Sequence, residues 1–339
     1  MSTKTFAGEK SATGSLGIRC CQVAVSSIDL ARSHWWYRNA LGFRTAGERR
    51  RRSGAHWATV PGLPEASFDV WCLVGRQSFA QFEAFEFRRP RVRRLPIDHR
   101  LCDLGYSMIG IHVPQFDESL ERIARLGGEP LTRPTGEPGS RRVCLHDPDG
   151  ILLELMEDPV LVAPDPSDGT DSEWRNLPSI ASVTASVRDL DRVRMFWVDV
   201  LGLAELPGTT VHQPRHEALW GLENARRESA VLNAGEIALE FVQYLEPVGR
   251  PRPAGYMISD QGVLNVAVGT TNRESFRAVY ERAVGHGFRG HAAPWTLPDV
   301  ATVVYLTDPQ GLSVELLHVE PGALERMGFR ATERDATPA

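Results

Sequence analysis

The sequence lacks the paired cysteines that build a zinc site or a disulfide framework. Its five cysteines all lie in the first half, and no two of them form a Cys-x-x-Cys pair. This usage is typical of a reducing, cytoplasmic compartment. Long apolar runs are also missing, because no stretch approaches the roughly 18 residues that a membrane-spanning helix needs, and no signal-peptide pattern opens the chain. We therefore expect a cytoplasmic protein without a membrane partner.

The chain also lacks a large excess of charge of one sign. A net charge of −5 over 339 residues gives no reason to expect a nucleic-acid partner. Two basic runs, 49–52 and 88–94, match no nucleic-acid motif, and we interpret them as solvated loops, with the steering of an anionic ligand as the alternative. With 42% hydrophobic residues the composition is that of a globular protein large enough for two or three domains. A small molecule is the expected ligand.

An Asp-Pro-X-Gly turn followed by a short apolar strand occurs twice, at 147–157 and 308–318. Proline and glycine set the dihedral angles of such a turn. One carboxylate, Glu154 or Glu315, lies inside each apolar strand. A buried carboxylate is costly unless it is compensated, so each is a candidate metal ligand, a general base, or a carboxylate that a Ser, Arg or backbone donor satisfies in a vestigial site.

The repeat belongs to a larger pattern of four similar units, each made of a strand, a helix and three strands. Residues 35–43, at the end of the first predicted helix, are echoed by 195–203. The pattern predicts an α+β fold of four βαβββ units. We expect a disordered tail at 1–16, a domain of two units at 17–158, a linker at 159–178, a second domain of two units at 179–320 and a C-terminal tail at 321–339.

These units resemble the vicinal oxygen chelate (VOC) superfamily, which includes glyoxalase I, extradiol dioxygenases and bleomycin-resistance proteins. The resemblance implies that the four units pair into two glyoxalase-like domains, within one chain or across a homodimer. It also implies that metal ligands come from the first and last strands of the units. By position these are Gln22, Glu83, Met108 and Glu154 in the first half, and Ser182, Glu240, Asn265 and Glu315 in the second.

The resemblance bears on the cofactor as well. Gln22, Glu83 and Glu154 match the ligand pattern of glyoxalase I, whereas the thioether of Met108 is a poor ligand for hard divalent ions. We therefore expect either no cofactor or a divalent metal held weakly by these three residues, with water completing the shell. In the second half only Glu315 matches the two-histidine, one-carboxylate iron site of extradiol dioxygenases, so such a site is not expected.

If Glu83 and Glu154 face one cavity without a metal, their repulsion and desolvation would raise the pKa of one of them toward neutrality, and the pair could move a proton beside a carbonyl. We therefore predict isomerase- or lyase-type chemistry on a small carbonyl-containing or aromatic metabolite, at a degenerate metal site in the first half. The predicted catalytic residues are Glu83, Glu154 and His112, although a structural role is the alternative for His112. The predicted substrate-binding residues are Gln22, Met108, Trp57, Trp71, Phe85, Tyr106 and His56.

Two other functions stay open. One is a non-catalytic protein that sequesters a drug-like molecule, and the other is an extradiol-type dioxygenase whose metal site lies elsewhere in the chain. His212 and His216 are four residues apart, but we discount them as a metal pair, because Pro214 prevents the helix that would align them.

Overall fold

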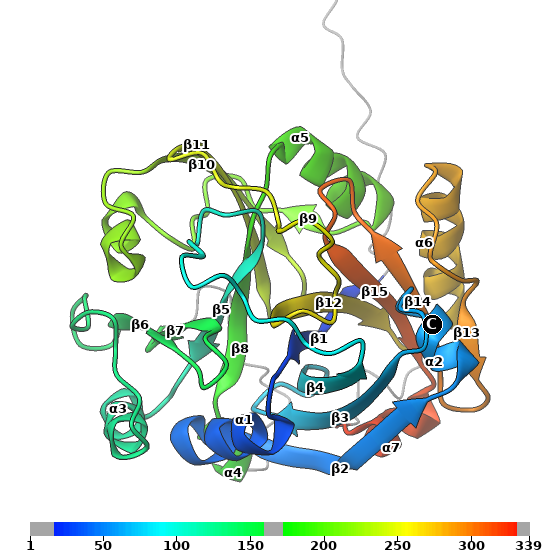
Figure 1. Cartoon of the computed structure of the whole chain (residues 1–339), viewed down its shortest axis with the longest axis horizontal. Coiled ribbons are helices and arrows are strands. Elements are labelled where there is room, and N and C mark those ends of the chain that lie inside the picture. Colours follow the sequence, from blue (N-terminus) through cyan, green and yellow to red (C-terminus); the bar gives the residue numbers. More distant parts are fainter. Residues whose placement is uncertain (1–16, 159–171, 331–339) are drawn as a thin grey trace, which may run out of the picture.

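A computed structural model describes residues 17–158 and 172–330 of the chain. The predicted disordered tail 1–16 and most of the predicted linker lie outside these ranges. In the described part, fifteen strands form two curled sheets with helices on their outer sides (Figure 1). The fold is thus α+β, as predicted. None of the helices within the described ranges has the length and apolar character needed to cross a bilayer.

Each of the four predicted units is present, and their elements follow one another along the chain. Unit 1 comprises β1 (Arg19–Ser26), α1 (Leu30–Trp36), η1 (Tyr37–Leu41), β2 (Arg44–Ser53), α2 (Ala55–Thr59), β3 (Ser67–Val74) and β4 (Gln81–Arg89). Unit 2 comprises β5 (Gly105–His112), α3 (Phe116–Arg125), β6 (Arg142–His146) and β7 (Leu152–Met156). A short helix, α4 (Ser172–Arg175), precedes the third unit.

The second half repeats this order. Unit 3 comprises β8 (Ser179–Ser186), α5 (Leu190–Val193), η2 (Arg194–Val200), β9 (Ala204–Glu205), η3 (Pro214–Trp220), β10 (Arg226–Asn233) and β11 (Ala238–Glu246). Unit 4 comprises β12 (Gly262–Thr270), α6 (Arg273–Gly285), β13 (Trp295–Leu297), β14 (Ala301–Thr307) and β15 (Ser313–Val319). The chain continues into η4 (Pro321–Ala323) and α7 (Leu324–Met327), where we expected a tail.

Two local expectations differ from the structure. Unit 2 has isolated bridges, such as Pro130 to Leu145, where the other units have their second strand, because the loop at 129–140 is rich in proline and glycine. The basic run Arg49 to Arg52 belongs to strand β2 and is not a loop, since it pairs in antiparallel register with β3.

The units pair across the two halves of the chain, and not within each half as we expected. The eight-stranded sheet has the order β13-β14-β15-β12-β1-β4-β3-β2, so it joins units 1 and 4. The seven-stranded sheet has the order β6-β7-β5-β8-β11-β10-β9 and joins units 2 and 3. At the centre of each sheet the first strands of two units run antiparallel, β1 beside β12 and β5 beside β8. Both pairings are made within one chain.

The repeated Asp-Pro-X-Gly turn explains how consecutive units stay together. The Tyr37 hydroxyl of unit 1 donates to the Asp147 carboxylate of unit 2 at 2.8 Å, and the turn's own backbone N–H groups donate to the same carboxylate. The Trp197 indole and the Asp308 carboxylate repeat this contact in the second half at 3.2 Å. Gly150 supplies the left-handed conformation of the turn with a φ of 80°. Each closing turn therefore anchors its unit to the helix of the unit before it.

Strand alternation separates the core from the concave side of each sheet. In β4, Phe82 and Ala84 are fully buried in the main core beneath the helices. Glu83 and Phe85, on the opposite face of the same strand, line a cavity. It is the concave faces that bring polar residues of distant units together.

Candidate active site

The concave face of the eight-stranded sheet encloses a cavity of about 390 Å³. Glu83 from β4 and Glu315 from β15 line this cavity, together with Gln22 from β1. Cys72 from β3 and Tyr305 from β14 line it as well. We call it the Glu83–Glu315 cavity. Its polar groups come from units 1 and 4, which are the two ends of the chain.

The two carboxyl groups of this cavity have pKa values close to neutral pH. Burial raises the pKa of Glu83 to about 8, and the charge of Glu315 adds to the rise. Burial likewise raises the pKa of Glu315 to about 7, although hydrogen bonds from Tyr305 and Asn265 act in the opposite direction. The Cys72 thiol lies 3.3 Å from Glu83 Oε1 and donates to it. Because the pair keeps at least one proton at neutral pH, one carboxyl group can donate a proton while the other accepts one.

Aromatic side chains form the apolar wall of the cavity. The indoles of Trp57 and Trp295 meet edge to face, with ring centroids 4.9 Å apart. The predicted binding residue His56 stacks on Trp295 with ring centroids 5.1 Å apart, but it is exposed and is not among the residues that line the cavity. Phe68 and Phe85 continue the wall, with centroids 5.3 Å apart. A wall of flat rings beside a few polar groups suits a small aromatic ligand.

The C-terminal segment closes one side of the cavity. Gln22 donates to the side chain of Gln81 at 3.0 Å, and Gln81 in turn donates to the carbonyl of Met327 at 2.6 Å. Phe329 is 3% exposed and stacks on Phe79 with centroids 4.7 Å apart. Residues 321–330, which we expected to begin a tail, are therefore part of the cavity wall.

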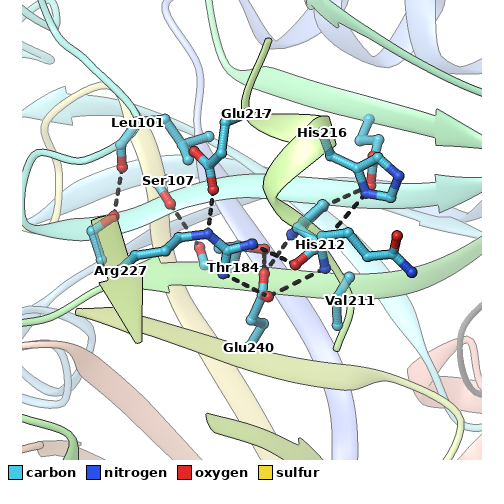
Figure 2. A network of polar contacts seen from close by, with 12 residues as sticks. Leu101, Ser107, Thr184, Val211, His212, His216, Glu217, Arg227 and Glu240 are labelled. Atoms are coloured by element: carbon cyan, nitrogen blue, oxygen red, sulfur yellow. Dashed lines mark hydrogen bonds and ion pairs between the residues drawn. The ribbon is translucent and has the colours of Figure 1, made fainter. Parts of the chain in front are cut away.

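The concave face of the other sheet holds a buried charge cluster around His212 (Figure 2). His212 lies in the segment between β9 and η3. Its Nδ1 donates to Glu240 Oε2 at 2.5 Å and its Nε2 donates to Glu154 Oε2 at 2.9 Å. All three side chains are at most 2% exposed. Glu154 and Glu240 occupy in this sheet the positions of Glu315 and Glu83 in the other.

Two arginines complete the His212 cluster. Arg142 lies 3.4 Å from Glu154 and donates to the carbonyl of Val211 at 2.9 Å. Arg227 forms an ion pair with Glu217 and lies 3.8 Å from Glu240 (Figure 2). The three cations, with His212 protonated, balance the three carboxylates. The cluster therefore buries its charges in pairs, as burial in a low-dielectric interior requires.

The pKa values follow from this pairing. Burial by itself would lower the pKa of His212, but the charges of Glu240 and Glu154 outweigh it and raise the pKa to about 10. Burial would raise the pKa of Glu154 and of Glu240, yet the charge of His212 lowers both. His212 is thus an imidazolium ion at neutral pH. Its positive charge lies between the carboxylates of Glu154 and Glu240 and compensates them.

The fold has known relatives. A family model described as the Glyoxalase/Bleomycin resistance protein/Dioxygenase superfamily matches residues 21–155 and 179–316, which make up most of the chain. The chain belongs to this superfamily. Within it, the structure of glyoxalase I from Zea mays is similar, with a TM-score of 0.58 and 18% identity over 89% of this chain and 92% of that one. A putative dioxygenase from Bacillus subtilis subsp. subtilis str. 168 has a TM-score of 0.56 and 13% identity over 93% and 90% of the two chains. At these identities the likeness shows the fold alone, and no curated protein matches the chain.

Because the superfamily resemblance implies a divalent metal, we asked whether the Glu83–Glu315 cavity offers suitable ligands. No three His, Cys, Asp or Glu side chains within 17–158 and 172–330 group as metal ligands. Two carboxylates and the carboxamides of Gln22 and Asn265 form an all-oxygen set instead. Asn265 Oδ1 is buried without a hydrogen-bond partner in the described structure. These residues fit a hard ion such as Mg²⁺ or Mn²⁺, which would also relieve the repulsion between the two carboxylates.

The expectation that Glu83 and Glu154 share one cavity is wrong. The two lie in different sheets, because units 1 and 2 pair with the other half and not with each other. The expected ligand set of Gln22, Glu83, Met108 and Glu154 is divided in the same way. Glu83 instead faces Glu315, and Glu154 contacts His212.

Several of the predicted binding residues lie elsewhere. Trp57 and Phe85 line the Glu83–Glu315 cavity, whereas Trp71 points to the outer face of β3 and stacks on His34 with centroids 3.5 Å apart. Tyr106 lines a separate hollow, and its hydroxyl donates to the carbonyl of Ser313. Trp71 was misplaced because adjacent strand residues point to opposite faces.

The predicted residues of β5 are structural. Met108 is fully buried in an apolar cluster with Leu152 and Leu219. His112 lies at the end of β5, 3.5 Å from the hydroxyl of Ser179, and does not reach the cavity. Burial lowers the pKa of His112, so it is neutral at pH 7. Neither residue can act with Glu83.

Sequence reasoning missed the role of His212. It discounted His212 and His216 as a metal pair and assigned His212 no other role, and the centroids of the two rings lie 6.3 Å apart. The carboxylate partners of His212 are Glu154 of β7 and Glu240 of β11. These strands flank the central pair β5 and β8 and are far apart in the sequence. The one available signal was a histidine in the second half that has no counterpart in the first.

Proposed function

We propose that this protein is an enzyme of the superfamily that moves a proton beside the carbonyl of a small carbonyl-containing or aromatic metabolite, in isomerase- or lyase-type chemistry, at the Glu83–Glu315 cavity. The observation that carries the proposal is the pair of carboxyl groups whose pKa values, about 8 and about 7, lie near neutral pH. General acids and bases work best in this range. The five free cysteines agree with a reducing, cytoplasmic setting.

In this reaction the ionised member of the pair removes a proton from the carbon next to the carbonyl. The protonated member donates its proton to the carbonyl oxygen, on which negative charge develops. The Tyr305 hydroxyl, hydrogen-bonded to Glu315, and the Cys72 thiol, bonded to Glu83, hold the two carboxyl groups in place. The aromatic wall of Trp57 and Trp295 excludes water on the other side.

If a divalent ion binds, Glu83, Glu315, Gln22 and Asn265 are the residues that would hold it. Such an ion would polarise the carbonyl oxygen as a Lewis acid. The same α-proton would then be removed by a base of the cavity. Metal content by plasma mass spectrometry, on protein purified without chelator, decides whether an ion is bound.

The test is exchange of the α-proton for deuterium, followed by proton NMR in D₂O. A panel of small aromatic and aliphatic ketones and 2-oxo acids is incubated with the wild type, Glu83→Gln and Glu315→Gln, each with and without added Mg²⁺ or Mn²⁺. We expect exchange of at least one panel member, and a loss of about 100-fold or more in both variants. Glu86→Gln, on the opposite face of β4, is the matched control and retains the rate. Exchange that persists in both cavity variants would refute the proposal.

A binding function without catalysis is the second candidate, and the aromatic corner of Trp57, Trp295 and His56 favours it. Flat rings of this kind bind planar drug-like molecules well. Quenching of indole fluorescence by a ligand that undergoes no exchange or turnover would support this role. A dioxygenase has less support, because no two histidines and one carboxylate within 17–158 and 172–330 are grouped so that they could hold a non-haem iron.

A further inference from the structure

The four consecutive arginines of β2 are divided by strand alternation into two pairs with different surroundings. Arg49 and Arg51 point to the outer face, where both bind the buried Asp69 carboxylate, at 2.6 and 2.9 Å. Arg50 and Arg52 lie on the opposite face and line the Glu83–Glu315 cavity. The outer pair is explained by its ion pairs with Asp69. The inner pair needs another explanation.

Neither inner guanidinium makes a hydrogen bond or ion pair with any residue in the ranges 17–158 and 172–330. Arg52 is half-buried, and its guanidinium lies over the Trp57 ring, 4.8 Å from the centroid. Burial lowers the pKa of Arg52, and the nearby charge of Arg50 lowers it further. Two like charges thus lie side by side at the cavity wall without a compensating carboxylate in contact.

The remaining groups of the cavity do not satisfy this charge. Glu83 accepts from the Cys72 thiol and Glu315 accepts from Asn265, and neither carboxyl group forms an ion pair with Arg50 or Arg52 within the described residues. A guanidinium held on an indole is fixed in orientation, and its planar donors match a carboxylate in two parallel hydrogen bonds. The side chains therefore leave a cationic end and a proton-transfer end in one cavity of about 390 Å³.

We infer that Arg52, with Arg50 beside it, binds a carboxylate group of the ligand, so that the substrate class is a small aromatic or carbonyl-containing carboxylic acid. The inference deepens the proposed function. That the bound acid is a substrate rests on the proposed function, whereas the binding of a carboxylate does not depend on catalysis. The carboxylate lies over β2, the aromatic body lies against Trp57 and Trp295, and the carbonyl points toward Glu83 and Glu315.

The experiment measures binding, by indole fluorescence, of aromatic acids and their methyl esters, with benzoylformate and methyl benzoylformate as the first pair. Phenylphosphonate tests whether a tetrahedral anion is preferred. The proteins are the wild type, Arg52→Gln, Arg50→Gln and the matched control Arg51→Gln, which removes the same charge from the other face of β2. Thermal unfolding of each variant confirms that it is folded.

We expect the wild type to bind the acid more tightly than the ester. Arg52→Gln should weaken acid binding about 10- to 100-fold and leave ester binding within about twofold. Arg50→Gln should have a smaller effect, and Arg51→Gln none. Arg52→Lys should restore only part of the affinity, because an ammonium lacks the planar fork.

Equal affinity for acid and ester across the set would overturn the inference, as would tighter binding of phenylphosphonate than of benzoylformate. An Arg51→Gln effect as large as that of Arg52→Gln would do the same. Failure of the proposed function looks different, since the acid preference would remain while proton exchange was unaffected by Glu83→Gln and Glu315→Gln. The two ideas can therefore fail separately.

Discussion

Replacing His212 with glutamine would leave Glu154 and Glu240 on either side of a neutral side chain in the interior of the seven-stranded sheet. In the wild type both ring nitrogens donate to these carboxylates, at 2.9 and 2.5 Å. Arg142 and Arg227 lie farther from them, at 3.4 and 3.8 Å. The variant therefore loses the cation that makes the closest contacts in the cluster.

The size of the effect follows from the burial of the cluster. Removing one partner of a buried ion pair typically costs about 3–5 kcal/mol, because the charge that remains is left uncompensated. A His212 pKa raised from 6.5 to about 10 corresponds to a stabilisation of the same order, about 5 kcal/mol at most. We expect His212→Gln to lower the free energy of unfolding by about 3–5 kcal/mol at pH 6.

The pH dependence is the sharper part of this prediction. The unfolded chain loses the His212 proton near pH 6.5, whereas the folded protein keeps it to about pH 10. The stabilisation by this proton is therefore complete below pH 6.5 and decreases as the pH rises toward 10, by up to about 1.4 kcal/mol per pH unit. Toward low pH it is lost as Glu154 and Glu240, whose pKa values are lowered, take up protons below about 4.5.

Urea unfolding of wild type and variant at pH 5.5, 6.5, 8 and 9.5 measures the difference, with a common slope for both proteins. His216→Gln is the control, because His216 lies in the same segment and burial lowers its pKa to about 4, so it carries no charge in this range. Its cost should stay near 1 kcal/mol and should not vary with pH. A His212→Gln cost below about 1 kcal/mol, or one that is constant from pH 6.5 to 9.5, would refute the reasoning.

Three further predictions concern stability. Glu83→Gln and Glu315→Gln should each make the protein more stable than the wild type at pH 9, by roughly 1–3 kcal/mol in urea unfolding, because a carboxyl group whose folded pKa is raised costs stability as the pH rises above 4.5; equal stability at pH 9 would contradict this. Tyr37→Phe removes the hydrogen bond to Asp147 and should lower the unfolding free energy by about 1–2 kcal/mol, whereas Tyr280→Phe, a half-buried tyrosine of α6, should change it little. Phe329→Ala should cost about 3 kcal/mol and increase quenching of the cavity indoles by acrylamide, since the C-terminal segment would detach from Phe79; unchanged quenching would show that this segment does not close the cavity.

The internal structure of each unit could be predicted from the sequence, but the pairing of the units could not. Turn residues and short apolar runs are local signals, and they located the Asp-Pro-X-Gly turns and the strands that follow them. The first strands of all four units, however, are similar short apolar runs such as 20–25 and 263–268. Any two of them could form the central antiparallel pair. The pairing depends on contacts between distant residues, such as the anchoring of Asp147 to Tyr37 across 110 positions, which no local pattern reveals.

The candidate site was predictable in part for the same reason. The repeated turn identified Glu154 and Glu315, and the superfamily resemblance added Glu83 and Glu240, but the partners of each depend on the pairing of the units. His212 could not be found because the segment before η3 has no periodic pattern. The basic run in β2 was interpreted as a loop because four consecutive arginines show no alternation of polar and apolar residues. Only the ion pairs of Arg49 and Arg51 with Asp69 distinguish the two faces of the strand.

The two concave faces compensate a buried pair of carboxyl groups in two different ways. Both bury a pair of carboxyl groups at equivalent strand positions, and such a pair requires either a cation or protons. In the His212 cluster the chain supplies the cation, so the carboxylates are ionised, satisfied and shielded from ligands. In the Glu83–Glu315 cavity no cationic side chain contacts the pair within the described residues, and protonation takes its place. Groups that are left in this unsatisfied state, beside open volume, are the ones that can exchange a proton with a ligand or accept a metal ion. This asymmetry between the two sheets is the reason why we place the proposed chemistry in the cavity formed by units 1 and 4.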